Sequence, residues 1–234
     1  MAESLPLVSS VRTTLPSAVI FDLDGTLIDS AHDVTIALNR ILPQTDAPRF
    51  TADEVKPLMG EGVRAVIQKA LLARGLRESE SGISHLKEQF LDIYCRERVS
   101  KTTAYPFAAA VIDELSAKRI SVGVCTNKDE GAARLILRQL GFDRQIGAVI
   151  GADSGFGRKP APAPLLACAS RLSVSPDQVV YVGDHRIDVE TARAANIPVV
   201  AVAYGYSGEP VGTLGANRTI TCLSELPVAI CGLI

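Results

Sequence analysis

The sequence predicts a doubly wound α/β fold, in which crossover helices pack on a parallel sheet and one helical module is inserted. Apolar, β-rich runs alternate with helical patterns over most of the 234 residues, which is typical of such a sheet. Residues 33–104 break the alternation, because they contain helical patterns without a convincing strand. Hydrophobic residues make up 47% of the chain and charged residues 21%, a balance that favours a globular protein over a disordered one.

The elements of the sheet follow in order along the chain. Five runs are expected to form strands: Ala18–Phe21, Ile120–Cys125, Ala148–Ile150, Val179–Val182 and Pro198–Ala203. Stretches with helical periodicity lie between them: Ala108–Lys118, Glu130–Leu140, Pro164–Leu172 and Val189–Ala195. Gly141 follows the second of these helices, where a glycine commonly closes a helix.

The inserted module is expected to be all-helical. Apolar residues recur at helical spacing in three stretches, Asp33–Leu42, Gly62–Ala73 and Ile83–Val99. The expected division of the chain is a flexible tail at 1–16, a core formed by 17–32 and 105–234, and the helical module at 33–104.

Composition limits the partners. Lysine and arginine sum to 24 against 26 acidic residues, so we expect no general attraction to nucleic acid or to an anionic membrane. No apolar run approaches the roughly 20 residues that span a bilayer. Five widely spaced cysteines without a C-x-x-C pair argue against a disulfide framework or a zinc site and favour reduced core residues in a cytoplasmic protein.

Polar residues follow four of the predicted strands. The first strand is followed by Asp22-Leu23-Asp24-Gly25-Thr26 and the second by Thr126-Asn127. The third is followed by a glycine-rich loop that leads to Arg158-Lys159-Pro160, and the fourth by Asp184 and Asp188. Ligands of an open parallel sheet bind beyond the carboxyl ends of the strands. These side chains are therefore expected to meet at one site.

The carboxylates of that site need a counter-charge. Two unit charges about 4 Å apart repel by roughly 4 kcal/mol at an effective dielectric of 20, so Asp22, Asp24, Asp184 and Asp188 cannot converge without a cation. All-oxygen ligation favours Mg²⁺, which suits a few carboxylates, waters and a substrate phosphate. Lys159 adds positive charge for a substrate anion.

The four elements, in this order, resemble the four motifs of the haloacid dehalogenase superfamily, and of its phosphatase branch in particular. DLDGT at Asp22–Thr26 resembles the first motif, Thr126 the second, Lys159-Pro160 the third and the GDxxxD of Gly183–Asp188 the fourth. The resemblance covers the chain from residue 17 onward, and the insertion matches the helical cap of the family. It implies a Rossmann-like core that acts on a small phosphorylated metabolite.

The resemblance also implies a role for each motif residue. Asp22 would be the nucleophile and would carry the phosphoryl group, while Asp24 would act as general acid and then as general base. Thr126, Lys159, the backbone of Asn127 and the turn amides of Leu23 and Gly25 would hold the phosphoryl oxygens. The Mg²⁺ ligands would be Asp22, Asp184, Asp188 and the backbone carbonyl of Asp24. Because dehalogenases lack an acid at the position of Asp24, a phosphatase or phosphomutase is favoured.

The expected ester is 2-phosphoglycolate. Asp29-Ser30-Ala31-His32-Asp33 resembles the DS-x-x-D segment of phosphoglycolate phosphatases, although His32 stands where that group usually has proline. Arg64, after a glycine-containing loop, could neutralise a substrate carboxylate, or could be a solvated arginine of a helix surface. Other possibilities are a sugar-phosphate or nucleotide phosphatase, a β-phosphoglucomutase-like mutase, a phosphonoacetaldehyde hydrolase with Lys56, Lys69 or Lys87 as its reactive lysine, and a catalytically silent binding protein. The sequence leaves monomer and homodimer equally open.

Overall fold

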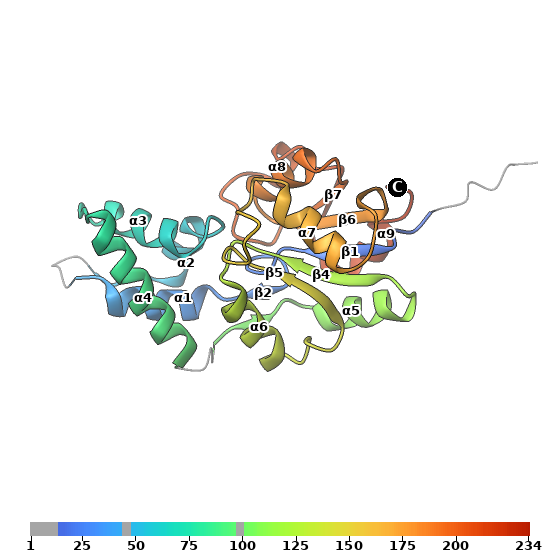
Figure 1. The fold of residues 1–234 in the computed structure, drawn as a ribbon. Coiled ribbons are helices and arrows are strands. Elements are labelled where there is room, and N and C mark those ends of the chain that lie inside the picture. Colours follow the sequence, from blue (N-terminus) through green and yellow to red (C-terminus); the bar gives the residue numbers. More distant parts are fainter. Residues whose placement is uncertain (1–13, 44–47, 97–100) are drawn as a thin grey trace, which may run out of the picture.

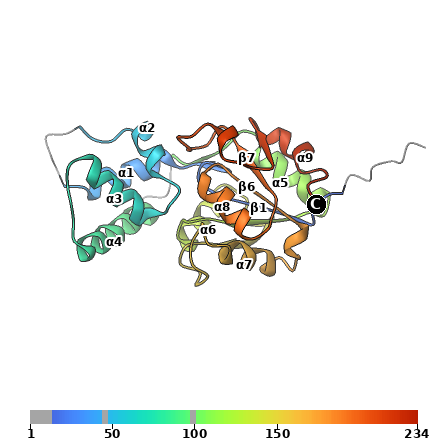
Figure 2. The ribbon, with the colours of Figure 1, turned by 90° about the horizontal axis from the view of Figure 1, so that it is seen from above.

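The computed structural model describes residues 14–43, 48–96 and 101–234, which form two parts that lie side by side (Figures 1 and 2). The larger part contains a six-stranded sheet with the strand order β5-β4-β1-β6-β7-β8, and all its pairings are parallel. The smaller part is helical and is inserted after β1. The predicted α/β fold with a helical insertion is confirmed. The predicted tail at 1–16 falls mostly outside the described residues.

The sheet strands are short and mostly buried. They are β1 (Ala18–Phe21), β4 (Ser121–Cys125), β5 (Ile146–Ile150), β6 (Val179–Gly183), β7 (Val199–Val202) and β8 (Arg218–Ile220). Five of them match the predicted runs, and β8 was not predicted. Its residues Arg218 and Thr219 are exposed, so this edge strand lacks the continuous apolar run of a buried parallel strand.

Alternate residues of each strand pack on opposite faces of the sheet. Val19 and Phe21 of β1 belong to the core cluster that also contains side chains of α5, α6 and α9. Ala18 and Ile20 belong to the cluster with side chains of α7 and α8. The core helices are α5 (Ala108–Ala117), α6 (Glu130–Gln139), α7 (Ala163–Arg171), α8 (Arg186–Ala194) and α9 (Leu226–Ala229).

Two core helices differ from the prediction. Helix α8 begins at Arg186 rather than at Val189, because His185 and Asp188 form a capping box that starts the helix one turn earlier. Histidine is not among the usual N-cap residues, so the sequence pattern did not mark this start. Helix α9 was not predicted, since it has only four residues.

The smaller part contains α1 (Ala31–Ile41), α2 (Ala52–Val55), α3 (Val63–Ala73) and α4 (Glu80–Arg96). Three of these helices were predicted, and α2 was missed although Thr51 and Glu54 form a capping box at its start. The predicted end of α4, at Val99, lies outside the described residues. The domain boundaries at 32/33 and 104/105 stay a prediction.

The two connections between the parts run side by side. Strand β2 (Ile28–Asp29) pairs with β3 (Thr103–Ala104) in an antiparallel two-stranded sheet that was not predicted. The carboxylate of Asp33 accepts hydrogen bonds from the amides of Lys101 and Thr102, at 3.0 and 2.6 Å. We call the smaller part the cap and the larger part the core. The paired strands β2 and β3 form the hinge between them.

The structure also bears on membrane-spanning helices and on disulfide bonds. No described helix is long and apolar enough to cross a bilayer. Cys125, Cys168, Cys222 and Cys231, the cysteines whose side chains are described, are free.

Candidate active site

The loop after β1 brings Asp22 and Asp24 to the carboxyl end of the sheet. Asp22 is buried, and its amide donates to the carbonyl of Val182 at 2.8 Å. Gly25 follows with φ +88°, and a Cβ at this position would lie 2.5 Å from the carboxylate of Asp184. Only glycine can make this turn without displacing that carboxylate. The amide of Gly25 donates to the carbonyl of Ile28, so in this structure it is already occupied within the turn.

Lys159 connects two of the carboxylates. Its ammonium lies 2.8 Å from Asp22 Oδ1 and 2.6 Å from Asp188 Oδ1, and it donates to the hydroxyl of Tyr181 at 3.1 Å. Burial by itself would lower the pKa of Lys159, but Asp188 and Asp22 raise it above its usual value. Lys159 is therefore a fixed cation beside Asp22.

Asp184 follows β6 and is held on both carboxylate oxygens. The hydroxyl of Thr26 donates to one at 3.1 Å, and the amide of Tyr206 donates to the other at 2.7 Å. Burial raises the pKa of Asp184 well above its usual value, and Asp188 and Asp22 raise it further. Asp188, the third residue of α8 and the acidic partner in its capping box, is completely buried.

These carboxylates fit a divalent cation. Ligand atoms of Asp22, Asp184 and Asp188 lie within 4.8 Å of one another. Oδ1 of Asp22 is buried and makes no hydrogen bond of suitable geometry. Burial raises the pKa of Asp22 to about 7, with Lys159 opposing and Asp188 reinforcing the shift. Four carboxylates with two buried lysines leave negative charge in excess, which a divalent cation would neutralise.

Tyr206 joins this cluster to the hinge and was not predicted. Its backbone holds Asp184, while its hydroxyl donates to Asp29 at 2.8 Å and accepts from the amide of Ser30 at 2.8 Å. No sequence motif marks Tyr206, because the contact depends on how the loop after β7 packs against the segment that follows β1.

Thr126 and Asn127 follow β4 as predicted. Asn127 Oδ1 accepts from the amide of Lys159 at 3.0 Å, and its Nδ2 donates to the carbonyl of Gly60 at 3.1 Å. Gly60 belongs to the loop before α3, so Asn127 links the core to the cap. A Cβ on Gly62, which has φ +88°, would lie 2.8 Å from the carbonyl oxygen of Asn127. The glycines of this loop allow the cap to approach the core this closely.

Asp24 has a cationic partner that the sequence analysis missed. Both of its carboxylate oxygens accept from Lys128 Nζ, at 3.0 and 3.2 Å, and Oδ1 also accepts from the hydroxyl of Ser30. Burial by itself would lower the pKa of Lys128, but Asp24 and Tyr94 raise it. The position of Lys128, two residues after Thr126 at a strand end, was the available signal.

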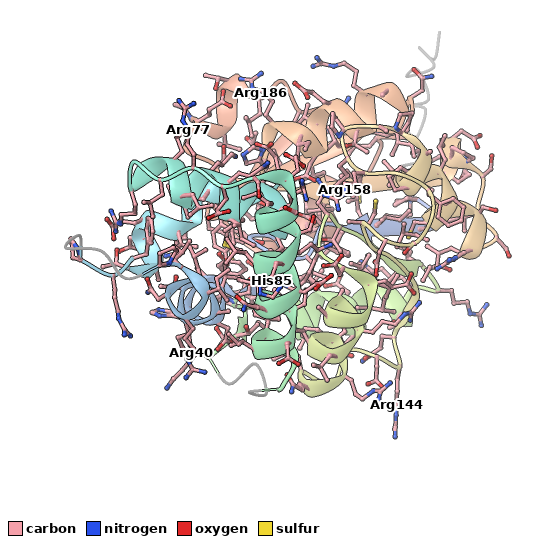
Figure 3. The ribbon with its side chains drawn as sticks, turned by 60° about the vertical axis from the view of Figure 1, so that its left-hand side comes forward. Arg40, Arg77, His85, Arg144, Arg158 and Arg186 are labelled. Atoms are coloured by element: carbon pink, nitrogen blue, oxygen red, sulfur yellow. The ribbon has the colours of Figure 1, made fainter. Side chains whose placement is uncertain are left out.

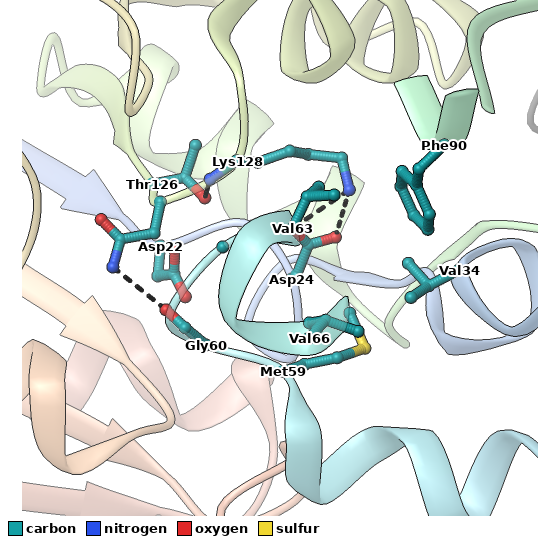
Figure 4. Close-up of a pocket in the computed structure, with 12 residues that line it drawn as sticks. Asp22, Asp24, Val34, Met59, Gly60, Val63, Val66, Phe90, Thr126 and Lys128 are labelled. Atoms are coloured by element: carbon teal, nitrogen blue, oxygen red, sulfur yellow. Dashed lines mark hydrogen bonds and ion pairs between the residues drawn. The ribbon is translucent and has the colours of Figure 1, made fainter. Parts of the chain in front are cut away.

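A small cavity lies between core and cap (Figure 4). Its volume is about 40 Å³, against roughly 10–15 Å³ for one water on the same measure. The core contributes Asp22, Asp24, Thr126, Asn127 and Lys128, and the cap contributes Val34, Met59, Gly60, Gly62, Val63, Val66 and Phe90. Polar groups that could act on a phosphate ester thus face a largely apolar wall.

The other predicted cap residues have partners elsewhere. Arg64 on α3 pairs with Glu80 and is not part of the cavity wall, which matches the helix-surface interpretation of this residue. His32 is exposed on α1. Lys56, Lys69 and Lys87 pair with Asp53, Glu61 and Asp129 respectively, and none lines the cavity.

Cys125 is a core residue and no nucleophile. It is completely buried in β4, and burial raises the pKa of its thiol to about 12. The thiolate, which is the reactive form, is therefore scarce near neutral pH.

A family model for haloacid dehalogenase-like hydrolases matches residues 19–202, which include all four motifs and the cap. The chain belongs to the haloacid dehalogenase-like hydrolases. In this family, a buried acidic cluster such as that of Asp22, Asp184 and Asp188 can hold a divalent metal.

Similar proteins are known within the family. The chain is 43% identical over 206 residues to a phosphoglycolate phosphatase of Rhodospirillum rubrum, and the match covers 86% of each protein. It is 39% identical to a phosphoglycolate phosphatase of Cereibacter sphaeroides, covering 89% of this chain and 95% of the relative. The crystal structure of a predicted phosphoglycolate phosphatase from Haemophilus somnus superposes with a TM-score of 0.83 at 25% identity, covering 92% of this chain and 98% of that one.

These likenesses determine the class of reaction. As a haloacid dehalogenase-like hydrolase with phosphatase relatives over nearly its whole length, the protein is a phosphoric monoester hydrolase. Its substrates are therefore phosphate monoesters.

Proposed function

We propose that this protein is a Mg²⁺-dependent phosphatase that hydrolyses 2-phosphoglycolate through a phosphorylated Asp22. The observation that carries the proposal is the placement of Asp22 and Asp24 in one small cavity, with Lys159 only 2.8 Å from Asp22. A carboxylate and an acid–base group in this arrangement suit attack on phosphorus and protonation of the leaving oxygen.

The proposed reaction has two steps. In the first, a carboxylate oxygen of Asp22 bonds to phosphorus, the bond from phosphorus to the ester oxygen breaks, and Asp24 gives its proton to the departing alkoxide. In the second, Asp24 takes a proton from water, the water oxygen bonds to phosphorus, and the bond from Asp22 to phosphorus breaks. Free Asp22 and inorganic phosphate result.

Several core groups would hold the phosphoryl oxygens as charge spreads over them. Thr126 lines the cavity, and Lys159 supplies a fixed positive charge. The amides of Leu23 and Asn127 complete the set in our proposal. Gly25 would join them only if its amide exchanged its bond to Ile28.

The cation would be held by Asp22, Asp184, Asp188 and the carbonyl oxygen of Asp24. When bound, Mg²⁺ supplies positive charge that favours the ionised form of Asp22 and neutralises phosphoryl oxygens. Asp188 is already bonded to Lys159 and to the amide of His185, so we assign it an outer position through water.

The choice of 2-phosphoglycolate is supported by two observations. Relatives at 43% and 39% identity are named phosphoglycolate phosphatases. In addition, Val34, Met59 and Phe90 of the cap close the cavity opposite Asp24, which favours a compact leaving group over a nucleoside.

The test is phosphate release by the purified protein with Mg²⁺ and then with EDTA. The esters are 2-phosphoglycolate, sugar phosphates, nucleoside monophosphates and an aryl phosphate. Metal-dependent release that is fastest from 2-phosphoglycolate is the expected result. Preference for another ester would overturn the substrate and leave the mechanism standing. An absence of release from every ester would overturn the function, and mass spectrometry of acid-quenched protein for phosphorylated Asp22 would test the intermediate.

A further inference from the structure

We propose that Lys128 is the residue that determines substrate specificity, because its ammonium binds the carboxylate of the ester on the leaving-group side of Asp24. The inference rests on the proposed function and identifies the part of the substrate that the cavity selects. It assigns to the core a role in specificity for which Arg64 of the cap was one of two possibilities left open by the sequence.

Lys128 is held in place from both parts of the molecule. It follows β4, lines the cavity, and has a side chain that is 7% exposed. Its Nζ contacts both carboxylate oxygens of Asp24 from the core side, and lies 4.6 Å from the ring centroid of Tyr94 on α4. Figure 4 shows the amine extended toward Asp24, with Phe90 beyond it. A cation fixed in this way can recognise an anion with little loss of side-chain entropy.

Lys128 is also the one cation among the described residues that line this cavity. The cap wall around it consists of Val34, Met59, Val63, Val66 and Phe90, with two glycines.

Five other described cations do not line this cavity. Arg158, whose Nη1 would lie 3.6 Å from a Cβ on Gly62, is exposed. Lys159 is bound to Asp22 and Asp188, and Arg64 is bound to Glu80. The labelled side chains of Arg77 and Arg144 point outward in Figure 3, and both are exposed. An anionic group that enters the apolar half of the cavity therefore meets Lys128 and no other positive charge of the wall.

The chemistry of the ester places its carboxylate beside this ammonium. In 2-phosphoglycolate a single methylene separates the ester oxygen from the carboxylate. If Asp24 protonates the ester oxygen, the carboxylate must lie next to the group that Asp24 binds, and that group is Lys128.

Lys128 has the donors for this second anion. An ammonium carries three N–H donors, and Asp24 accepts from Lys128 with two oxygens, so a donor remains. Because burial of an ammonium is costly, a second carboxylate that replaces lost water stabilises the complex. An ester with a hydroxymethyl group in place of the carboxylate would forgo this charge-assisted hydrogen bond.

The experiment compares two esters of nearly the same size, 2-phosphoglycolate and 2-hydroxyethyl phosphate, which differ in the carboxylate. We expect the unaltered protein to prefer 2-phosphoglycolate in kcat/KM by at least about 10-fold. In Lys128→Met the preference should fall by roughly 10- to 100-fold, since the methionine keeps most of the length of the side chain and removes its charge. Any weakening of Asp24 lowers both rates together and cancels in the ratio.

Lys87→Met is the matched control. Lys87 also joins cap to core, through Asp129 at 3.1 Å, and does not line the cavity. Its loss should leave the preference within about twofold of the unaltered protein, as expected for an ion pair outside the site. Circular dichroism of both variants checks the fold, and Lys128→Gln serves if the methionine variant is unfolded.

The outcomes separate the inference from the proposed function. Equal loss on both esters in Lys128→Met would overturn the inference, because Lys128 would then act only by positioning Asp24. Absence of any preference in the unaltered protein would overturn it without a variant. If no ester is hydrolysed, the proposed function fails, and calorimetric titration of the two esters into the unaltered protein then tests the inference. Tighter binding of 2-phosphoglycolate that Lys128→Met abolishes supports the inference. Equal binding of the two esters overturns it.

Discussion

The two walls of the cavity differ in composition and in how their side chains are held. On the core wall, Asp22 and Asp24 are bound to buried lysines. On the cap wall, the side chains of Met59, Val63 and Phe90 make apolar contacts, and the approach to the core depends on a glycine loop. The comparison indicates a division of roles in the proposed mechanism: the fixed charges of the core would perform the chemistry, and the cap would give the site its shape and exclude water.

The largest expected effect is that of Asp22→Asn. The amide is a poor nucleophile, so turnover should fall by at least about 1000-fold on every ester, aryl phosphates included. The fold should persist, because asparagine has nearly the same size. Phosphate release and thermal unfolding measure the two effects. Near-normal turnover would show that the chemistry does not reside in this wall.

Asp24→Asn should have a smaller effect that depends on the leaving group. Loss of the general acid should lower kcat on 2-phosphoglycolate by roughly 100- to 10,000-fold. An aryl phosphate, whose leaving group needs less protonation, should lose much less. The measurement is kcat of the variant and of the unaltered protein on each ester, which gives the loss for each leaving group. An equal loss on both would contradict the assignment of Asp24 as the acid.

Gly62→Ala tests the cap wall. Its new Cβ would press on the carbonyl of Asn127, at 2.8 Å, and should hold the cap away from the core, lowering kcat/KM by about 10-fold. Gly75→Ala is the control, because Gly75 also has positive φ, +70°, but has no atom within 4 Å of the added Cβ. Both variants should lose roughly 1 kcal/mol of stability. If Gly75→Ala lost as much activity, close approach of the cap would not be the cause.

The smallest expected effect is on stability without metal. Burial raises the pKa of Asp22 in the folded chain to about 7, whereas in the unfolded chain it is about 3.9. Between these values the folded state binds more protons than the unfolded state, so the free energy of unfolding should fall as pH rises and level off above about 7.

Denaturant titrations in EDTA at about pH 5 and about pH 8 measure this fall, which should be on the order of 1 kcal/mol or more. Asp22→Asn should reduce it, and Mg²⁺ should offset it in the unaltered protein. A rise in stability over the same interval would contradict the sign of the shift.

The two walls were also unequally predictable from the sequence. The core motifs each follow a strand directly, and the carboxyl ends of parallel strands meet at one edge. The acidic cluster of Asp22, Asp184 and Asp188 was therefore accessible to prediction, and the structure brings these side chains together.

The contacts of the cap could not be predicted from the sequence in the same way. Whether Arg64 faces the cavity or pairs with Glu80 depends on how α3 packs against α4, and periodicity does not determine that. Lys128 was overlooked for a related reason, because its role depends on the distance that its side chain spans to Asp24. The strand β8 escaped prediction since only one of its three residues is buried.

The paired connections between cap and core also affect how the chain folds. β1 and β4 are neighbours in the sheet, yet the whole cap separates Phe21 from Ser121 along the chain. Once the cap has formed and Ile28 has paired with Ala104, the loop that remains to be closed is about a quarter as long. Since each halving of a loop lowers its closure cost by about 0.6 kcal/mol, a cap that folds first makes the central pairing of the sheet easier by about 1 kcal/mol.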